Sequence, residues 1–171
     1  MPMIGVAVPI PEPHGSFLAE RREFFGDPLA HAIPPHVTLL PPTQVSADEL
    51  IDFEAHLAAV GKRHRPFRIA LGSTGTFRPV SPVVFVQLVA GSVECQALES
   101  DIRTGPVTRE LDFDYHPHVT VAHNVSEEEL DAAFVGLDGF SVAFDVPAIV
   151  LYHHGEDDVW RPERAFDLQG E

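Results

Sequence analysis

A short pattern occurs twice in this chain and limits the folds open to it. The first copy reads Pro-His-Val-Thr-Leu at 35–39, followed by Val-Ser-x-x-Glu-Leu at 45–50. The second reads Pro-His-Val-Thr-Val at 117–121, followed by Val-Ser-x-x-Glu-Leu at 125–130. A chain with 10 histidines in 171 residues would contain His-x-Thr less than once by chance, so two copies in one context indicate an internal duplication.

Each copy combines a strand signal with a helix start signal. The run after each proline is short and β-branched, as in a buried strand. Ser46 with Glu49, and Ser126 with Glu129, have the spacing of a capping box at a helix N-terminus. Each copy is therefore predicted to form a strand, a short turn and a capped helix.

The rest of the chain alternates between strand and helix signals. Prolines 41 and 42 are predicted to close the strand of the first copy, and Gly61 to end the helix after it. Helices are predicted to begin at Ser16, Ser46, Ser92 and Ser126. Strands are predicted at residues 4–9, 36–40, 67–71, 83–89, 117–122, 140–146, 148–153 and 160–168. Helices between strands, with antiparallel strands at the end, predict an α+β fold.

The side chains of a strand alternate between its two faces, which gives the duplicated motif a chemical meaning. His36 and Thr38 are predicted to share one face of their strand while the flanking apolar residues enter the core. The same alternation places His118 and Thr120 on one face of theirs. If a pseudo-two-fold axis relates the two strands, two imidazoles and two hydroxyls meet in one cleft.

Such a cleft suits in-line displacement at a phosphodiester. A neutral histidine can take a proton from the attacking hydroxyl or water, and a protonated one can give a proton to the leaving oxygen. Threonine hydroxyls can donate hydrogen bonds to the non-bridging phosphate oxygens. This chemistry needs no metal, cofactor or covalent intermediate.

The two motifs resemble the paired His-x-Thr motifs of the two-histidine (2H) phosphoesterase superfamily, and in particular its bacterial 2′,5′ RNA ligase-like branch of RNA 2′,3′-cyclic phosphodiesterases. The resemblance extends from the first strand almost to the end of the chain. It implies one domain over residues 1–171, with two pseudo-symmetric lobes of antiparallel-rich sheet and outer helices flanking a central cleft, one motif coming from each half. It also implies that His36 and His118 are the acid–base pair and that Thr38 and Thr120 bind the phosphate.

The same resemblance implies an activity. It is the hydrolysis of a 2′,3′-cyclic phosphate, on a nucleotide or an RNA end, to a 2′-phosphomonoester, with 2′,5′ RNA ligation as its reverse counterpart. Members that act on RNA often carry an arginine shortly after the second motif, where this chain has His123. His123 therefore favours a small cyclic nucleotide or an ADP-ribose cyclic phosphate over long RNA.

Four further residues are candidates for substrate contacts. Phe77 and Arg78 lie in a turn-rich segment where the family often places cleft residues. Phe77 could stack on a base and Arg78 could pair with phosphate. Tyr115 is a second candidate for base stacking, and His123 lies close to the second motif.

Charge limits the partners. With 26 acidic and 11 basic residues, the formal net charge is −15, which argues against binding a long duplex nucleic acid. No apolar run approaches the roughly 18 residues that span a bilayer, and the start of the chain lacks the basic region of a secretory signal. We expect a cytoplasmic monomer without membrane association that acts on a small cyclic nucleotide or an RNA terminus.

Two alternatives from other functional classes remain open. A metal-dependent hydrolase could use His116 and His118 as ligands, completed by His123 or by the pair His153 and His154. A non-catalytic module could use the same fold to bind a nucleotide or RNA, although binding alone needs no matched acid and base.

Overall fold

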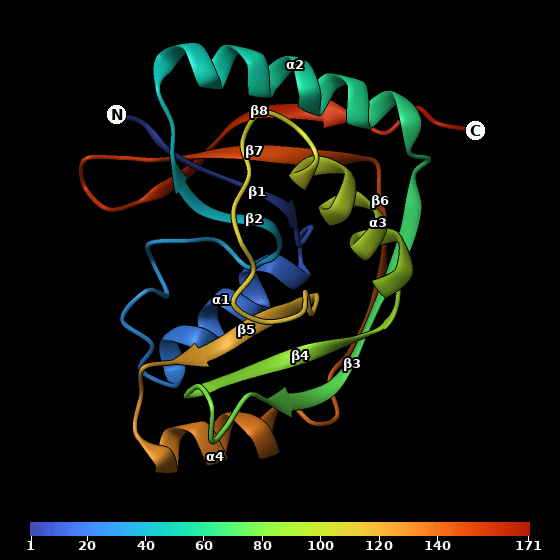
Figure 1. Cartoon of the computed structure of the whole chain (residues 1–171). Coiled ribbons are helices and arrows are strands. Elements are labelled where there is room, and N and C mark those ends of the chain that lie inside the picture. Colours follow the sequence, from blue (N-terminus) through green and yellow to red (C-terminus); the bar gives the residue numbers. More distant parts are fainter.

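The computed structural model describes residues 1–171 and contains two four-stranded antiparallel sheets and four helices (Figure 1). The strands are β1 (Met3–Pro9), β2 (His36–Gln44), β3 (Phe67–Thr76), β4 (Val83–Ala90), β5 (His118–His123), β6 (Ser141–Val146), β7 (Ala148–His154) and β8 (Trp160–Asp167). The helices are α1 (His14–Phe24), α2 (Ala47–Arg63), α3 (Ser92–Arg103) and α4 (Glu127–Gly136). None of them is long and apolar enough to cross a membrane.

The two sheets form the two lobes of the molecule. The first has the order β2-β1-β7-β8 and is built from the two ends of the chain, whereas the second, β5-β4-β3-β6, is built from its middle. The unit β1-α1-β2-α2 recurs as β4-α3-β5-α4, so the duplicated motif belongs to a duplicated supersecondary unit. The expected two-lobed α+β fold is confirmed, and β2 and β5 are equivalent edge strands, one in each sheet.

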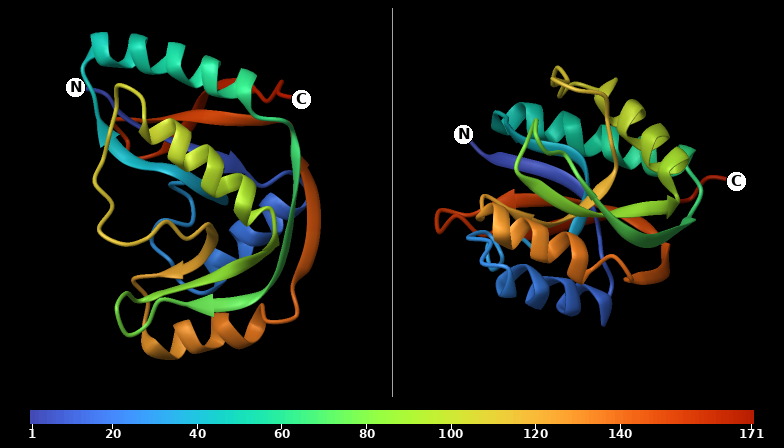
Figure 2. Two further views of the ribbon diagram at one scale, coloured as in Figure 1. Left: turned by 45° about the vertical axis from the view of Figure 1, so that its right-hand side comes forward. Right: turned by 90° about the horizontal axis from the view of Figure 1, so that it is seen from below.

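The helices connect the lobes as well as covering them. The long helix α2 runs beside β8 at the top of Figure 1, and α4 covers β3, β4 and β5 at the bottom. In contrast, α1 packs against β5 and α3 packs against β2, so each of these helices contacts the motif strand of the other half (Figure 2). The motif strands β2 and β5 also contact each other. These contacts between the two halves hold the two motif strands side by side.

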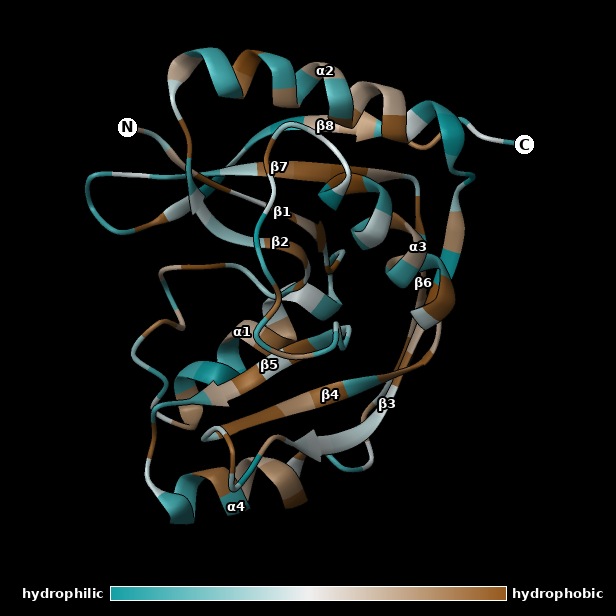
Figure 3. Cartoon of the chain, in the orientation of Figure 1, coloured by the Kyte–Doolittle hydropathy of each residue, from teal (hydrophilic) through white to brown (hydrophobic).

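One hydrophobic core serves both lobes. A continuous cluster of 33 buried residues includes members from both sheets, among them Val37 of β2, Val119 of β5 and Ile149 of β7. In the hydropathy view the central strands β4 and β7 are largely hydrophobic, while the helices alternate between hydrophilic and hydrophobic residues (Figure 3). Because burial of apolar surface is the main favourable term in folding, a shared core couples the stability of the two lobes.

Prolines 41 and 42 do not close β2, contrary to the prediction. The strand continues through them to Gln44, with a register shift opposite Ile4 and Val6 of β1. Proline cannot donate a ladder hydrogen bond, but an edge strand with a bulge can accommodate it. The edge position of β2 explains the error.

Three local predictions also need correction. Helix α1 begins at His14 rather than at Ser16, and its N-cap, Pro13, makes no side-chain capping bond. Gly61 lies inside α2, and a Cβ there would collide with the backbone oxygen of Asp167 in β8, so glycine permits a close crossing instead of ending the helix. The strand predicted at 67–71 extends to Thr76 as β3.

The capping prediction is confirmed at both motif helices. Ser46 accepts a hydrogen bond from the Glu49 amide, and the Glu49 carboxylate accepts one from the Ser46 amide, which completes a capping box on α2. Ser126 accepts the equivalent bond from the Glu129 amide on α4.

We expect Ser46→Ala to lower the free energy of unfolding by about 1 kcal/mol, because an amide at the start of α2 loses its acceptor. Urea unfolding followed by circular dichroism measures this. Ser92→Ala is the control, because α3 has Gly91 as its N-cap and no side-chain capping bond. Equal losses in the two variants would contradict the assignment of Ser46 as a cap.

Candidate active site

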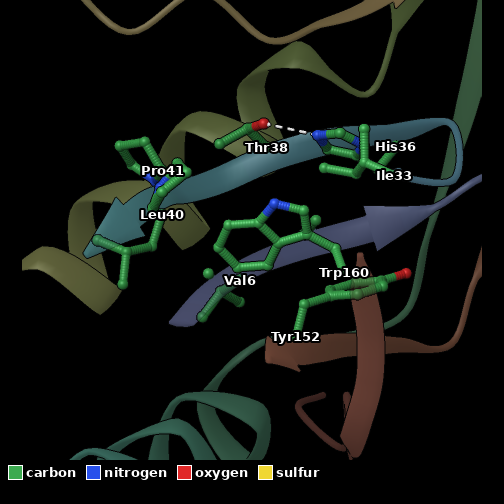
Figure 4. Close-up of a pocket in the computed structure, with 11 residues that line it drawn as sticks. Val6, Ile33, His36, Thr38, Leu40, Pro41, Tyr152 and Trp160 are labelled. Atoms are coloured by element: carbon green, nitrogen blue, oxygen red, sulfur yellow. Dashed lines mark hydrogen bonds between the residues drawn. The ribbon is translucent and has the colours of Figure 1, made fainter. Parts of the chain in front are cut away.

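Strand β2 presents His36 and Thr38 on one face. Both side chains are half-buried, whereas Val37 and Leu39 between and after them are buried in the core. The His36 Nε2 atom lies 3.1 Å from the Thr38 hydroxyl oxygen, within hydrogen-bond distance (Figure 4). The period-two alternation predicted from the sequence is present.

Strand β5 repeats this arrangement from the other lobe. His118 and Thr120 are half-buried, and Val119 and Val121 are fully buried. Strands β2 and β5 contact each other, and the charge of a protonated His118 is a minor factor that lowers the pKa of His36. The four motif residues predicted to share a cleft are therefore brought together between the lobes.

The backbone before each motif histidine anchors its ring in the same way. His36 Nδ1 lies 2.8 Å from the Pro34 carbonyl oxygen, and His118 Nδ1 lies 2.6 Å from the His116 carbonyl oxygen. A carbonyl only accepts hydrogen bonds, so each Nδ1 must carry a proton, and Nε2 is the atom left free to exchange one. The prolines at 35 and 117 favour an extended backbone at the preceding residue, whose carbonyl accepts the bond.

Burial shifts both histidines toward the neutral form. Desolvation is the main cause that lowers the pKa of His36 to about 4. The hydrogen bond to the Pro34 carbonyl raises this pKa, and the charges of Arg22 and His118 lower it further. Desolvation also lowers the pKa of His118, against its bond to the His116 carbonyl. At neutral pH both rings in the free protein can accept a proton at Nε2.

Two cavities adjoin the motif residues. The main cavity, of about 720 Å³, contacts Thr38, His118 and Thr120, and the side cavity, of about 460 Å³, contacts His36 and Thr120. The main cavity falls in the size range of small-ligand sites. Its wall also contains residues of the second lobe, from the β3–β4 connection, the segment before β5 and β5 itself, including Phe77, Val80, Ser81, Phe113, Tyr115, His116 and His123.

Three of the four candidate contact residues line the main cavity. The Phe77 ring lies edge-on to His118, with centroids 4.9 Å apart, and supports that imidazole. The Tyr115 hydroxyl donates a 2.7 Å hydrogen bond to the Thr38 carbonyl, which ties the segment before β5 to β2. His123 lies where the main and side cavities meet.

Arg78 does not line these cavities, so its predicted contact with phosphate needs correction. Its Nη1 atom donates to Asp131 at 2.7 Å and to Glu127 at 3.1 Å, both on α4. These two carboxylates, more than forty residues away in sequence, raise the pKa of the Arg78 guanidinium and direct it toward α4. Arg78 therefore links the β3–β4 connection to helix α4.

A small recess lies behind the first motif (Figure 4). It has a volume of about 40 Å³, and its walls include His36, Thr38, Tyr152 and Trp160. The Trp160 ring lies close to Gly5, where a Cβ would be 3.6 Å from the indole. The recess is too small for a nucleobase, and Trp160 serves as a wall behind His36. The sequence patterns did not identify this role.

Sequence reasoning also missed Arg22, which lines the side cavity with its side chain only 5% exposed. The spacing of residues along the helix could have indicated this burial. Leu18 and Arg22 are four residues apart, so they occupy the same buried face of α1.

The ligands proposed for a metal do not form a cluster. The structure contains no group of three or more His, Cys, Asp or Glu side chains that could hold a metal ion. His116 and His118 have ring centroids 6.1 Å apart and both pack against Phe77. The metal-dependent alternative therefore lacks a ligand set.

Two lobes that each bring a His-x-Thr strand to a shared cleft define the class of two-histidine phosphoesterases. Residues 10–158 match the family model described as the 2′-5′ RNA ligase superfamily, and the chain belongs to that superfamily.

Known relatives and solved structures agree with this assignment. A protein of Bacillus cytotoxicus named "Putative phosphoesterase" is 26% identical over 145 residues, which cover 83% of each chain. TT0787 of Thermus thermophilus has the same fold, with a TM-score of 0.72, 22% identity and full coverage of both chains. LigT of Escherichia coli in complex with 3′-AMP has a TM-score of 0.68 at 21% identity, with 98% of this chain and 99% of that one covered.

Proposed function

We propose that this phosphoesterase is a metal-independent cyclic phosphodiesterase. It hydrolyses the 2′,3′-cyclic phosphate of a nucleotide or an RNA end to a 2′-phosphomonoester, as a monomer in the cytoplasm. The observation that carries the proposal is the matched anchoring of His36 and His118, each with Nδ1 on a backbone carbonyl, so that Nε2 is the nitrogen that can accept a proton. Nucleotide binding alone would not need two imidazoles held in the same tautomer.

The environments of the two rings suggest how the roles are divided. Burial lowers the pKa of His36 to about 4 and keeps this ring neutral, so His36 acts as the general base, and His118 acts as the acid in its protonated form. His36 Nε2 removes a proton from water as the water oxygen bonds to phosphorus. The bond from phosphorus to O3′ breaks, and His118 Nε2–H donates its proton to O3′. The phosphate remains on O2′, and the two histidines exchange protonation states, so solvent restores the starting forms.

The threonines complete the site. In the free protein the Thr38 hydroxyl can donate to His36 Nε2 across 3.1 Å. With a phosphate bound, rotation about its side-chain torsion lets Thr38 donate to a non-bridging oxygen instead, and Thr120 does so from the opposite strand. These bonds stabilise the charge that develops on phosphorus during the attack.

The main cavity accommodates the rest of the substrate. At about 720 Å³ it has room for a nucleoside, and Phe77 and Tyr115 offer aromatic surface. Structures of Escherichia coli LigT hold 3′-AMP, ATP, NADP⁺ or phosphate, which supports a nucleotide ligand for this fold. The −15 charge of the chain supports a small substrate or an RNA terminus over a long duplex.

The direct test is product identification. The purified protein is incubated with 2′,3′-cyclic AMP, CMP, GMP and UMP, ADP-ribose 1″,2″-cyclic phosphate, and a short RNA with a 2′,3′-cyclic end. Chromatography then separates the 2′- and 3′-monophosphates, and EDTA is present in a parallel series. We expect 2′-phosphates at a rate that EDTA does not change. The 3′-isomer as sole product, or loss of activity on chelation, would refute the proposal. A 2′,5′-linked product from the cyclic end and a 5′-hydroxyl RNA would show ligation.

The pH dependence follows from the two pKa shifts. A lowered histidine pKa means that the ring loses its proton at a lower pH than usual. We therefore expect kcat/KM to fall below about pH 4, where the base His36 becomes protonated, and again on the alkaline side of the His118 pKa, which lies below its ordinary value of 6.5. The measurement is kcat/KM for 2′,3′-cyclic AMP from pH 3.5 to 9. A profile that keeps rising through pH 8 would contradict these assignments.

A further inference from the structure

Arg22 occupies an unusual position for an arginine. It lies on the buried face of α1, the helix that packs against β5 of the opposite lobe, and its side chain is only 5% exposed. Burying a guanidinium is costly unless it is paired and hydrogen-bonded. In this structure only the Nε atom of the guanidinium has a hydrogen-bond partner in the protein.

That partner is Asp27, in the segment after α1. Its Oδ2 atom accepts a 2.7 Å hydrogen bond from Arg22 Nε and a 2.9 Å bond from the His123 amide, and its Oδ1 atom accepts from the Leu29 amide at 2.8 Å. The carboxylate thus holds Arg22 by Nε and fixes the end of β5. Asp27 therefore links the Arg22 guanidinium to the backbone of the motif strand β5.

The two terminal nitrogens of Arg22 have no acceptor in the protein. The only hydrogen bond of this side chain uses Nε, yet no buried side-chain nitrogen or oxygen lacks a partner. The Nη atoms must therefore reach open space, and the open space beside Arg22 is the side cavity, whose other walls include His36, Thr120 and His123. Paired Nη–H donors of this kind match the geometry of two phosphate oxygens.

Charge around the site is asymmetric. Arg22 is the only arginine or lysine lining the main cavity, the side cavity or the recess. Helix α3, the counterpart of α1 in the duplicated unit, instead places Glu99 beside the main cavity, where Arg103 Nε binds it at 2.8 Å. The α1 side of the cleft thus has a guanidinium, paired with Asp27, where the α3 side has a carboxylate, and Asp158 is the one carboxylate that lines the side cavity. The charge of Arg22 also acts on His36, whose pKa it helps to lower.

We infer that Arg22 is a phosphate-binding residue of this site, whose two free Nη atoms donate to non-bridging oxygens of the cyclic phosphate and of the phosphomonoester product. Asp27 is its positioning residue. The inference rests on the proposed function for the identity of the substrate, but the binding of a phosphate group by Arg22 can be tested without turnover.

The test is calorimetric binding of inorganic phosphate and of adenosine 2′-monophosphate, with adenosine as the ligand without phosphate. The variants are Arg22→Met, Arg22→Lys and the double variant Arg22→Met/Asp27→Asn, which removes both charges of the buried pair so that no carboxylate is left uncompensated. Circular dichroism confirms folding. Arg21→Met is the matched control, because Arg21 is the next residue of α1 and its guanidinium lies over the Phe24 ring, 4.8 Å from its centroid.

We expect Arg22→Met and the double variant to bind phosphate and adenosine 2′-monophosphate about 10- to 100-fold more weakly, as is typical for lost hydrogen bonds to a charged group. Arg22→Lys should retain part of the affinity, and adenosine binding should not change. Wild-type phosphate affinity in a folded double variant, or an equal loss in Arg21→Met, would overturn the inference. If the wild type binds phosphate through Arg22 but hydrolyses no cyclic phosphate, the proposed function fails and this inference stands.

Discussion

His36→Ala and His118→Ala are each expected to reduce kcat/KM for a 2′,3′-cyclic nucleotide by about 10²- to 10⁴-fold, the usual contribution of a positioned acid or base. Each substitution removes one Nε2 atom from the cleft, so one of the two proton transfers must rely on water. The rings are half-buried at the cleft surface, and their removal leaves the core residues Val37 and Val119 in place. We therefore expect folded proteins whose loss is in chemistry, measured by steady-state kinetics on the preferred cyclic phosphate.

The double variant should lose little more than the worse single variant, since the acid and the base act as a unit and their effects are not additive. His153→Ala is the control, because this exposed histidine of β7 lines none of the three cavities and belonged to the metal-ligand alternative. Wild-type turnover by the double variant would refute the two-histidine mechanism. A large loss in His153→Ala would revive the metal-dependent alternative.

The central features of this site could be predicted from the sequence because they follow from local rules. The period of two along a strand is enough to place His36 with Thr38, and His118 with Thr120. The capping signals at Ser46 and Ser126 are local as well. The duplication allowed the further step that the two strands would meet, since related units tend to pack about a pseudo-two-fold axis.

Other features depend on tertiary packing and could not be predicted this way. Nothing local to Arg78 shows that Asp131 on α4 will bind its guanidinium, and nothing local to prolines 41 and 42 shows that β2 is an edge strand. Sheet membership is likewise non-local, because β7 joins β1 across most of the chain. The signal for Arg22 was present in the helical period, but charged residues on helices are usually exposed and the pattern alone does not distinguish them.

The structure also changes the interpretation of the acidic composition. A net charge of −15 repels polyanions that approach the protein. Salt screens this repulsion beyond about 8–10 Å. A phosphate inside the cleft is affected mainly by the closest groups, which in the side cavity include Arg22, the histidines and Asp158. The fold thus combines an acidic chain with a single arginine at the cleft, which is paired with Asp27. This arrangement supports the proposal of a single phosphate ester as substrate over a continuous nucleic-acid backbone.

Asp27→Ala is expected to lower the free energy of unfolding by about 3–5 kcal/mol, the usual cost of removing one partner from a buried ion pair. The Asp27 side chain is fully buried, and its loss leaves the Arg22 guanidinium without a counterion and the Leu29 and His123 amides without acceptors. Because the His123 amide belongs to β5 whereas Arg22 belongs to α1, the change also weakens the attachment between the two halves. Urea unfolding followed by circular dichroism measures the loss.

Asp157→Ala is the control, because it removes the partner of Arg161 from an exposed pair and should leave the unfolding midpoint almost unchanged. If both aspartate variants unfold at the wild-type midpoint, Asp27 does not brace the site.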